Sequence, residues 1–157
     1  MEFQNVAIRG AATTDIPACA ALIAKQEAGE ERYWQERFEN DLLNPKRTFL
    51  VAVFNDEVVG YGHTVQHSST LLDEESGPSG FFLSGLLVAP EHRRSGIGSK
   101  LTGARIDLLR SQADIIYYYA DPENAETISM HARLGFEEYR SMTRFGKDFK
   151  LFRLDLR

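Results

Sequence analysis

A short segment of the chain combines residue types that bind anions. It consists of Arg93, Arg94, Ser95, Gly96, Ile97, Gly98 and Ser99. An apolar run precedes the segment and a helical pattern follows it, so the free N–H groups of a first helical turn and the positive end of the helix dipole face one point. Guanidinium and hydroxyl groups add donors that suit phosphate oxygens. We therefore predict an anion site here, and a pyrophosphate fits it better than a single carboxylate.

The two common nucleotide-binding motifs do not match this segment in detail. The pattern G-x-G-x-x-G requires a third glycine where the chain has Leu101. A phosphate-binding loop that runs from Gly98 through Gly103 requires lysine next, and Ala104 stands there. The sequence therefore favours neither of these nucleotide-binding folds.

The histidines and the cysteine show no metal or nucleophile pattern. His63 and His67 are four residues apart on a predicted strand, which separates them by ~13 Å, so we expect no metal ion between them. Cys19 is the one cysteine of the chain and lies in an apolar run, which indicates a small buried residue rather than a nucleophile. A reducing cytoplasm is consistent with this cysteine content.

Length and charge narrow the class of protein. The chain has 157 residues and a formal net charge of −5. Nucleic acids and anionic membranes recruit domains with an excess of Lys and Arg, so we expect neither as a partner. The length favours a single domain over residues 1–157. The first residues lack the pattern of a signal peptide, and no window reaches the ~18 apolar residues of a membrane span, so we expect a cytoplasmic protein.

The hydrophobic pattern predicts the elements that position the anion site. Strands are expected at 6–9, 48–54, 57–67, 81–88, 114–120, 137–145 and 149–157, helices at 15–27, 31–43, 96–112 and 123–134, and a long surface loop at 68–80. This order predicts a mixed α/β (α+β) sheet whose strands 81–88 and 114–120 form a parallel pair joined by a crossover helix. Strand 81–88 is almost continuously apolar, so we expect it to be buried on both faces. Ligands of such sheets favour the carboxyl ends of parallel strands.

The anion segment also resembles the signature of a known family. Residues 93–98 fit the pattern Arg/Gln-x-x-Gly-x-Gly/Ala of the GNAT superfamily, whose members are N-acetyltransferases that use acetyl-coenzyme A. The preceding Val88-Ala89-Pro90 and the later segment 124–136, NAETISMHARLGF, are also similar to the family. The resemblance implies the GNAT-like acyl-CoA N-acyltransferase fold, with about seven strands, four helices and a splayed parallel strand pair at its centre.

The resemblance further implies where coenzyme A binds. The pyrophosphate would lie on the backbone amides of residues 93–99, and the pantetheine arm would run between the two parallel strands. Leu86 and Val88 would offer backbone groups to the pantetheine amides. Asn124 matches a family position that hydrogen-bonds the coenzyme, and it is equally consistent with a helix cap. Gly85 indicates either a bulge in its strand or the close packing of a neighbouring side chain.

The catalytic groups are less clearly marked. His131 stands where many family members have a tyrosine that acts as an acid toward the coenzyme sulfur, so the resemblance implies that role for it. A histidine with an unperturbed pKa of ~6.5 is equally consistent with orienting the thiolate, relaying a proton or packing between helix and coenzyme. Strand 81–88 contains no Asp or Glu to act as the base. The remaining candidates for the base are Glu30, Glu31, His63, Tyr117 and Tyr119.

These features together predict an acetyl transfer to a primary amine. The resemblance places the acceptor pocket at residues 27–40, which are acidic and aromatic, and at 139–150. A small-molecule amine fits best, and a peptide or protein acceptor stays open. The missing tyrosine and strand carboxylate motivate an alternative, a non-catalytic acyl-CoA-binding sensor or assembly module. The resemblance is compatible with a monomer or a homodimer.

Overall fold

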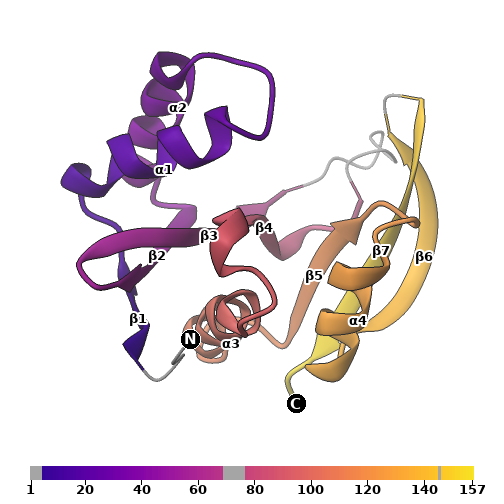
Figure 1. The fold of residues 1–157 in the computed structure, drawn as a ribbon. Helices are drawn as coiled ribbons and strands as arrows, with labels where there is room; N and C mark the ends of the chain where they lie inside the picture. The colour runs from indigo at the N-terminus through magenta and orange to yellow at the C-terminus, as the bar shows by residue number, and fades with distance from the viewer. Residues whose placement is uncertain (1–4, 69–76, 145) are drawn as a thin grey trace.

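The sheet expected from the sequence is present. A computed structural model describes residues 5–68, 77–144 and 146–157. Its strands form a seven-stranded sheet in the order β1-β2-β3-β4-β5-β7-β6 (Figure 1). The strands are β1 (Ala7–Gly10), β2 (Arg47–Phe54), β3 (Glu57–His67), β4 (Gly80–Val88), β5 (Ile115–Ala120), β6 (Glu137–Arg144) and β7 (Lys147–Asp155). The helices are α1 (Ile16–Ala24), α2 (Glu31–Leu43), α3 (Ile97–Leu109) and α4 (Ala125–Arg133).

Most element boundaries agree with the prediction to within a few residues. The helices predicted over 15–27 and 96–112 end earlier, at Ala24 and Leu109. Most of the surface loop predicted over 68–80 lies outside the described residues. Within the described ranges, no helix combines the length and the apolar content that a membrane crossing requires.

Helices cover both faces of the sheet (Figure 1). On β2, Phe49 and Val51 pack under α1 and α2, while Leu50 and Ala52 point the other way and pack against α3. This alternation follows from the two-residue period of a strand and gives each face its own core. Cys19 is fully buried in the core under α1 and α2, and its desolvation raises the pKa of the thiol to about 12. The cysteine therefore has the structural role predicted for it.

The parallel strands β4 and β5 pair over only a short distance. Phe81 pairs with Ile116 and Phe82 pairs with Tyr117, and there the parallel register ends. The rest of β4 then diverges from β5, which confirms the predicted splayed pair. The prediction that β4 is buried on both faces was wrong. Only Phe82 and Leu83 are buried in this strand, because its second half borders the gap between the strands instead of a neighbour.

A bulge marks the middle of β4. Tyr61 of β3 faces Leu87, whereas His63 faces Ser84, so Gly85 and Leu86 together oppose the single residue Gly62. Gly85 has φ +63°, and a Cβ built on it would lie 3.1 Å from Cδ2 of His63. Both interpretations of this glycine therefore hold, because it forms a bulge and also admits a close neighbour. The bulge bends β4 where the gap to β5 opens.

Candidate functional site

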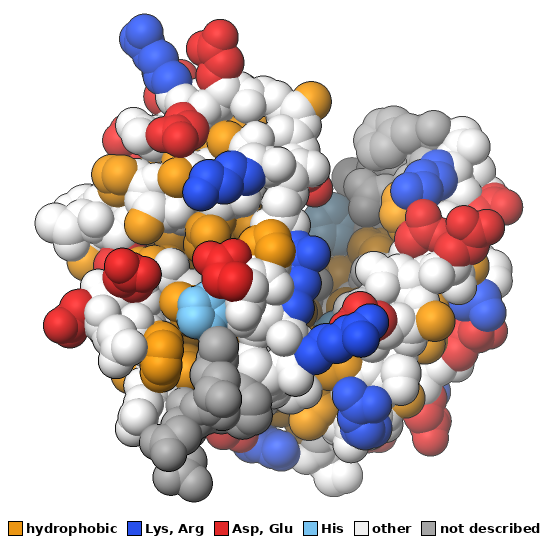
Figure 2. All heavy atoms as spheres, in the orientation of Figure 1, with side chains coloured by type: hydrophobic (Ala, Val, Ile, Leu, Met, Phe, Trp, Pro, Cys, Tyr) orange, Lys and Arg blue, Asp and Glu red, His pale blue; other side chains and the backbone are white. Residues whose placement is uncertain are grey.

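Two cavities meet at the bulge. One, the α3 cavity, has a volume of about 580 Å³ and lies between the end of β4, the start of α3 and α4. The other, the α2 cavity, has a volume of about 490 Å³ and lies between α2 and strands β3 and β4. Gly85 lines the α2 cavity and the next residue, Leu86, lines the α3 cavity. Figure 2 shows the surface hollowed between the half that carries α1 and α2 and the half that carries α4, with Lys and Arg side chains along its border.

The α3 cavity gathers nine of the ten predicted binding residues. They are Leu86, Val88, Arg93, Arg94, Gly96, Ile97, Gly98, Ser99 and Asn124. Sequence reasoning missed Thr127, Met130 and Arg133 of α4, which also line the cavity. Their spacing of three residues from Asn124 onward, which places them on one helix face, was the available signal.

The backbone at the start of α3 leaves its first N–H groups available. Gly96 occupies the N-cap position with φ +84°, and no side chain caps the helix. Arg94 also adopts a left-handed conformation, with φ +60°. A Cβ on Gly98 would lie 3.9 Å from both Leu86 and Val88, so it would project into the cavity. A helix N-terminus with uncapped amides and arginines beside it is suited to a phosphate group.

Arg93 and Ser95 hold the loop in shape. The Nε–H of Arg93 donates to the carbonyl of Val88 at 3.1 Å, and its guanidinium also donates to the side chain of Gln26. The hydroxyl of Ser95 is buried and donates to the carbonyl of His92, so the structure does not bring it into the cavity. We predicted that this hydroxyl donates to phosphate. The structure instead gives it a structural role, because a backbone carbonyl already accepts its hydrogen.

Asn124 combines its two predicted roles. Its Oδ1 accepts a hydrogen bond of 3.3 Å from the N–H of Thr127, so it caps α4. The residue also lines the α3 cavity. Because the cap uses Oδ1, the NH₂ group of the side chain is the part that suits a ligand acceptor.

His131 is more buried than the acid role requires. It is 3% exposed and stacks on Tyr118 with ring centroids 3.8 Å apart. Its Nδ1 lies 2.8 Å from the carbonyl oxygen of Thr127, and a carbonyl can only accept, so Nδ1 carries the hydrogen and Nε2 a lone pair. Burial lowers the pKa of His131 to about 4, so the ring is neutral near pH 7 and has no proton to give at Nε2. In the described chain it lines neither cavity, and this geometry disfavours the predicted acid.

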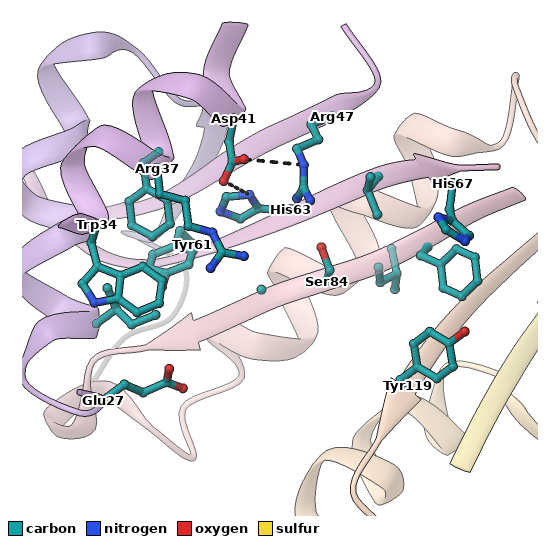
Figure 3. Close-up of a pocket in the computed structure, with 16 residues that line it drawn as sticks. Glu27, Trp34, Arg37, Asp41, Arg47, Tyr61, His63, His67, Ser84 and Tyr119 are labelled. Atoms are coloured by element: carbon teal, nitrogen blue, oxygen red, sulfur yellow. Dashed lines mark ion pairs between the residues drawn. The ribbon is translucent and has the colours of Figure 1, made fainter. Parts of the chain in front are cut away.

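The α2 cavity has aromatic and charged walls (Figure 3). Residues 27–40 contribute Glu27, Trp34, Arg37 and Phe38, as predicted for the acceptor pocket. In the described chain, 139–150 contributes no lining residue, because β6 and β7 lie beyond β5. Of the candidate bases, the cavity includes His63 and Tyr119; Glu30, Glu31 and Tyr117 do not line it.

His63 is neutral and faces the bulge. Burial, followed by nearby Arg47, Arg105 and Arg37, lowers the pKa of its ring to about 3. Its Nδ1 lies 3.8 Å from Oδ2 of Asp41, and its Nε2 is buried without a partner among the described residues. The Cδ2–Nε2 edge of the ring lies against Gly85. A ring with such a low pKa is a much weaker base than an amine, so His63 can accept a hydrogen bond but is poorly suited to act as the general base.

Arg105 is the residue that sequence reasoning missed entirely. It is 1% exposed, and within the described ranges no carboxylate pairs with it. Its guanidinium instead donates to the carbonyls of His63 at 3.0 Å and Ser84 at 3.3 Å, and to the hydroxyl of Thr102 at 2.8 Å. These two carbonyls flank the bulge, so Arg105 fixes its geometry from the α3 side. The available signal was its place on the apolar stripe Ile97, Leu101, Arg105 and Leu109, where a charged residue is unexpected.

One sequence relative and one family model match the chain. An uncharacterised protein of Mycobacterium leprae is 26% identical over 123 residues, which cover 78% of this chain but only 32% of that protein's length. The sequence model of the acetyltransferase (GNAT) family matches residues 16–136.

Solved structures of low sequence identity share the fold. A Salmonella typhimurium acetyltransferase with its cofactor acetyl-CoA has a TM-score of 0.77 and 22% identity, covering 98% of this chain and 95% of the other. The ribosomal-protein-S18-alanine N-acetyltransferase of Escherichia coli has a TM-score of 0.75 and 19% identity, with 96% and 94% covered. An aminoglycoside 6′-acetyltransferase of type Ii has a TM-score of 0.77 and 19% identity, with 96% and 97% covered. The family model spans most of the chain, and its signature segment forms the start of α3, so this protein belongs to the acetyltransferase (GNAT) family.

Proposed function

We propose that the protein is an N-acetyltransferase that moves the acetyl group of acetyl-CoA to a primary amine of a small molecule. The observation that carries the proposal is the meeting of two cavities at the gap between β4 and β5. The α3 cavity has a helix N-terminus and arginines suited to a pyrophosphate, and the α2 cavity has room for an acceptor. Family membership supports the reaction class. A cytoplasmic location stays the prediction made from the sequence.

The residues present fit acetyl-CoA as a substrate. The uncapped amides at the start of α3 and the guanidinium of Arg94 would hold the pyrophosphate. Beyond Phe82, the described part of β4 has no parallel partner on β5, so the backbone of Leu86 and the N–H of Val88 would face the pantetheine amides. The thioester would then lie at the bulge, where the cavities meet.

Acetyl transfer there needs little help from a protein acid. The amine nitrogen bonds to the thioester carbon, the C–S bond breaks, and its electron pair leaves with the sulfur. A backbone N–H of residues 86–88 would stabilise the oxyanion. The amine must be neutral to attack, and we favour loss of its ammonium proton to bulk solvent before the attack, because a His63 ring with a pKa of about 3 is too weak a base to remove it. The extra proton that the nitrogen carries after the attack then passes to the leaving thiolate or to solvent. The leaving thiolate has a parent pKa of ~8.5, so water can also reprotonate it.

The choice of a small molecule rests on the place of the α2 cavity. It lies under α2 and is lined by the buried rings of Trp34, Phe38 and Tyr61, which suits a compact acceptor. The solved relatives are named for different amines, an alanine of a ribosomal protein in one and aminoglycosides in another. The fold alone therefore does not determine the class of acceptor, and we infer it from the side chains that line this cavity.

A thiol-release assay tests the proposal. The protein is supplied with acetyl-CoA and, in turn, with amino acids, polyamines, aminoglycosides and peptides with a free N-terminus. We expect saturable acetyl-CoA binding and release of free coenzyme thiol with at least one small amine. Binding without release by any class would favour the alternative, a non-catalytic acyl-CoA-binding module, which the neutral histidines and the missing strand carboxylate motivate. Absence of binding by folded protein would overturn both.

The variant His131→Phe separates the roles left to this histidine. Phenylalanine keeps the stacking on Tyr118 but removes both ring nitrogens. Because Nε2 carries no proton at neutral pH, we expect kcat to fall by about tenfold or less, with unchanged affinity for acetyl-CoA. A general acid contributes about 100-fold or more to the rate. A fall in kcat of that size in a fully folded variant would therefore support the predicted acid role of His131. Steady-state kinetics beside coenzyme titration calorimetry distinguishes the two results.

A further inference from the structure

Within the described ranges, the charged residues of the α2 cavity form one paired group and leave Arg37 without a carboxylate partner. Asp41 lies 3.5 Å from the guanidinium of Arg47 and 3.8 Å from the ring of His63, so its charge is already matched. No ion pair among the described residues includes Arg37, although this residue also lines the cavity. The Cζ of Arg37 lies 5.5 Å from the centroid of the Trp34 ring. The cavity therefore holds a guanidinium that lies beside an aromatic ring and has no carboxylate partner in the part of the chain that the structure describes.

The orientation of Arg37 differs from that of another arginine on the same helix. Figure 3 shows Arg37 reaching from α2 into the cavity, toward β4 at Ser84. Arg32 instead pairs with Glu36 at 3.4 Å on the exposed surface and does not line the cavity. Arg37 consequently presents its donors close to the bulge that begins after Ser84, where the acyl group would lie.

These charges suit a zwitterion better than a polycation. A polyamine or an aminoglycoside carries several ammonium groups and needs several unmatched carboxylates. Among the described residues that line the cavity, Glu27 is the one unmatched carboxylate, because Asp41 is paired. An extra positive charge would also face Arg37 and Arg47. An anionic group beside the reacting amine would remove this conflict, because guanidinium groups bind carboxylates with two parallel hydrogen bonds.

We infer that the acceptor is an α-amino acid or a close analogue, with Arg37 binding its carboxylate. The inference rests on the proposed function and names its substrate class. The amine and carboxylate of such a molecule share one carbon, so a carboxylate on Arg37 brings the nitrogen to the bulge. The unpartnered Nε2 of His63 lies beside Gly85 and accepts a hydrogen bond from that nitrogen. The rings of Trp34, Phe38 and Tyr119 contact an apolar side chain.

Matched pairs of acceptors test this assignment. L-Phenylalanine is compared with phenethylamine, and L-leucine with 3-methylbutylamine, each pair differing in the carboxylate. L-Phenylalaninamide keeps the α-amine but carries no negative charge, so it controls for amine basicity. We measure thiol release, and also binding by calorimetry to the protein saturated with coenzyme A. One charge-assisted interaction predicts a preference of about 10- to 100-fold for the amino acids over both uncharged forms.

The variant Arg37→Gln should abolish this preference while leaving acetyl-CoA affinity unchanged. Arg32→Gln is the matched control on the same helix and should keep the preference. Equal or better use of the decarboxylated amines by the wild type would overturn the inference, as would an unchanged preference in Arg37→Gln. If no acceptor gives thiol release, the proposed function fails, and the calorimetric preference for amino acids still decides the role of Arg37.

Discussion

The variant Gly98→Val is expected to lose at least about 100-fold in affinity for acetyl-CoA while it stays folded. A Cβ at this position would make only ordinary contacts with Leu86, Val88 and Met130, all at 3.9 to 4.0 Å, and would point into the cavity, so we expect the fold to accept a side chain there. The helix propensity of valine is also slightly better than that of glycine, by about 0.5 kcal/mol or less. The branched side chain would, however, occupy the space beside the first-turn amides, which a pyrophosphate needs.

Gly103→Val provides the matched control for this prediction. Gly103 lies in the same helix, and a Cβ there would meet nothing within 4 Å. We expect this variant to bind acetyl-CoA like the wild type. Titration calorimetry gives the affinities, and thermal unfolding shows whether both variants are folded. Wild-type affinity in a folded Gly98→Val protein would remove the start of α3 from the coenzyme site.

Replacing Arg105 by methionine is expected to lower turnover by at least about 100-fold and to destabilise the fold. The guanidinium satisfies the carbonyls of His63 and Ser84, and a buried carbonyl left without a donor costs about 1–3 kcal/mol. Methionine fills much of the space and removes the cost of a buried charge, so we expect a net loss of about 2 kcal/mol in the free energy of unfolding. Without the donors, the bulge no longer holds the Leu86 backbone in place.

The titration of His63 distinguishes this role from general destabilisation. Arg105 is one of the charges that lower the pKa of His63 and of His131, so Arg105→Met should raise the pKa of both rings. NMR titration of the histidine ring protons measures this shift. Arg105→Lys keeps the charge but not the fork of donors, so it should keep the low pKa values and restore only part of the turnover. Thr102→Val removes the hydroxyl partner of Arg105 but leaves its two strand carbonyls, so it should cost about 1 kcal/mol in stability and little turnover.

Sequence patterns predicted the parts of the site that depend on local structure. The order of strands and helices follows from the period of apolar residues, and Gly96 and Gly98 mark a strand-to-helix connection whatever surrounds them. The Gly85 bulge was also accessible, because a glycine inside an apolar strand is itself a signal, whereas the splayed pair was expected from the resemblance to the family. These features need no knowledge of distant contacts.

The parts that sequence did not predict depend on tertiary contacts. The carbonyl of Thr127 fixes the ring hydrogen of His131 on Nδ1, and burial against Tyr118 lowers the pKa of the ring. No sequence pattern around residue 131 reveals this burial. Arg93 meets Gln26 across 67 residues of sequence. The place of Arg105 on the apolar stripe of α3 indicates burial, but its partners are carbonyls of two strands, and nothing near residue 105 in the sequence identifies them.

The short pairing between β4 and β5 makes this strand junction the weakest in the sheet. In the described chain, the first four strands and the last three are joined edge to edge only where Phe81 pairs with Ile116 and Phe82 pairs with Tyr117. Regions with few backbone hydrogen bonds open at a lower free energy than a continuous ladder. A pantetheine chain laid along the free edge of β4 would act as a temporary eighth strand. The bound substrate would thus supply hydrogen bonds that the sheet lacks at this edge, and each release of product would remove them again.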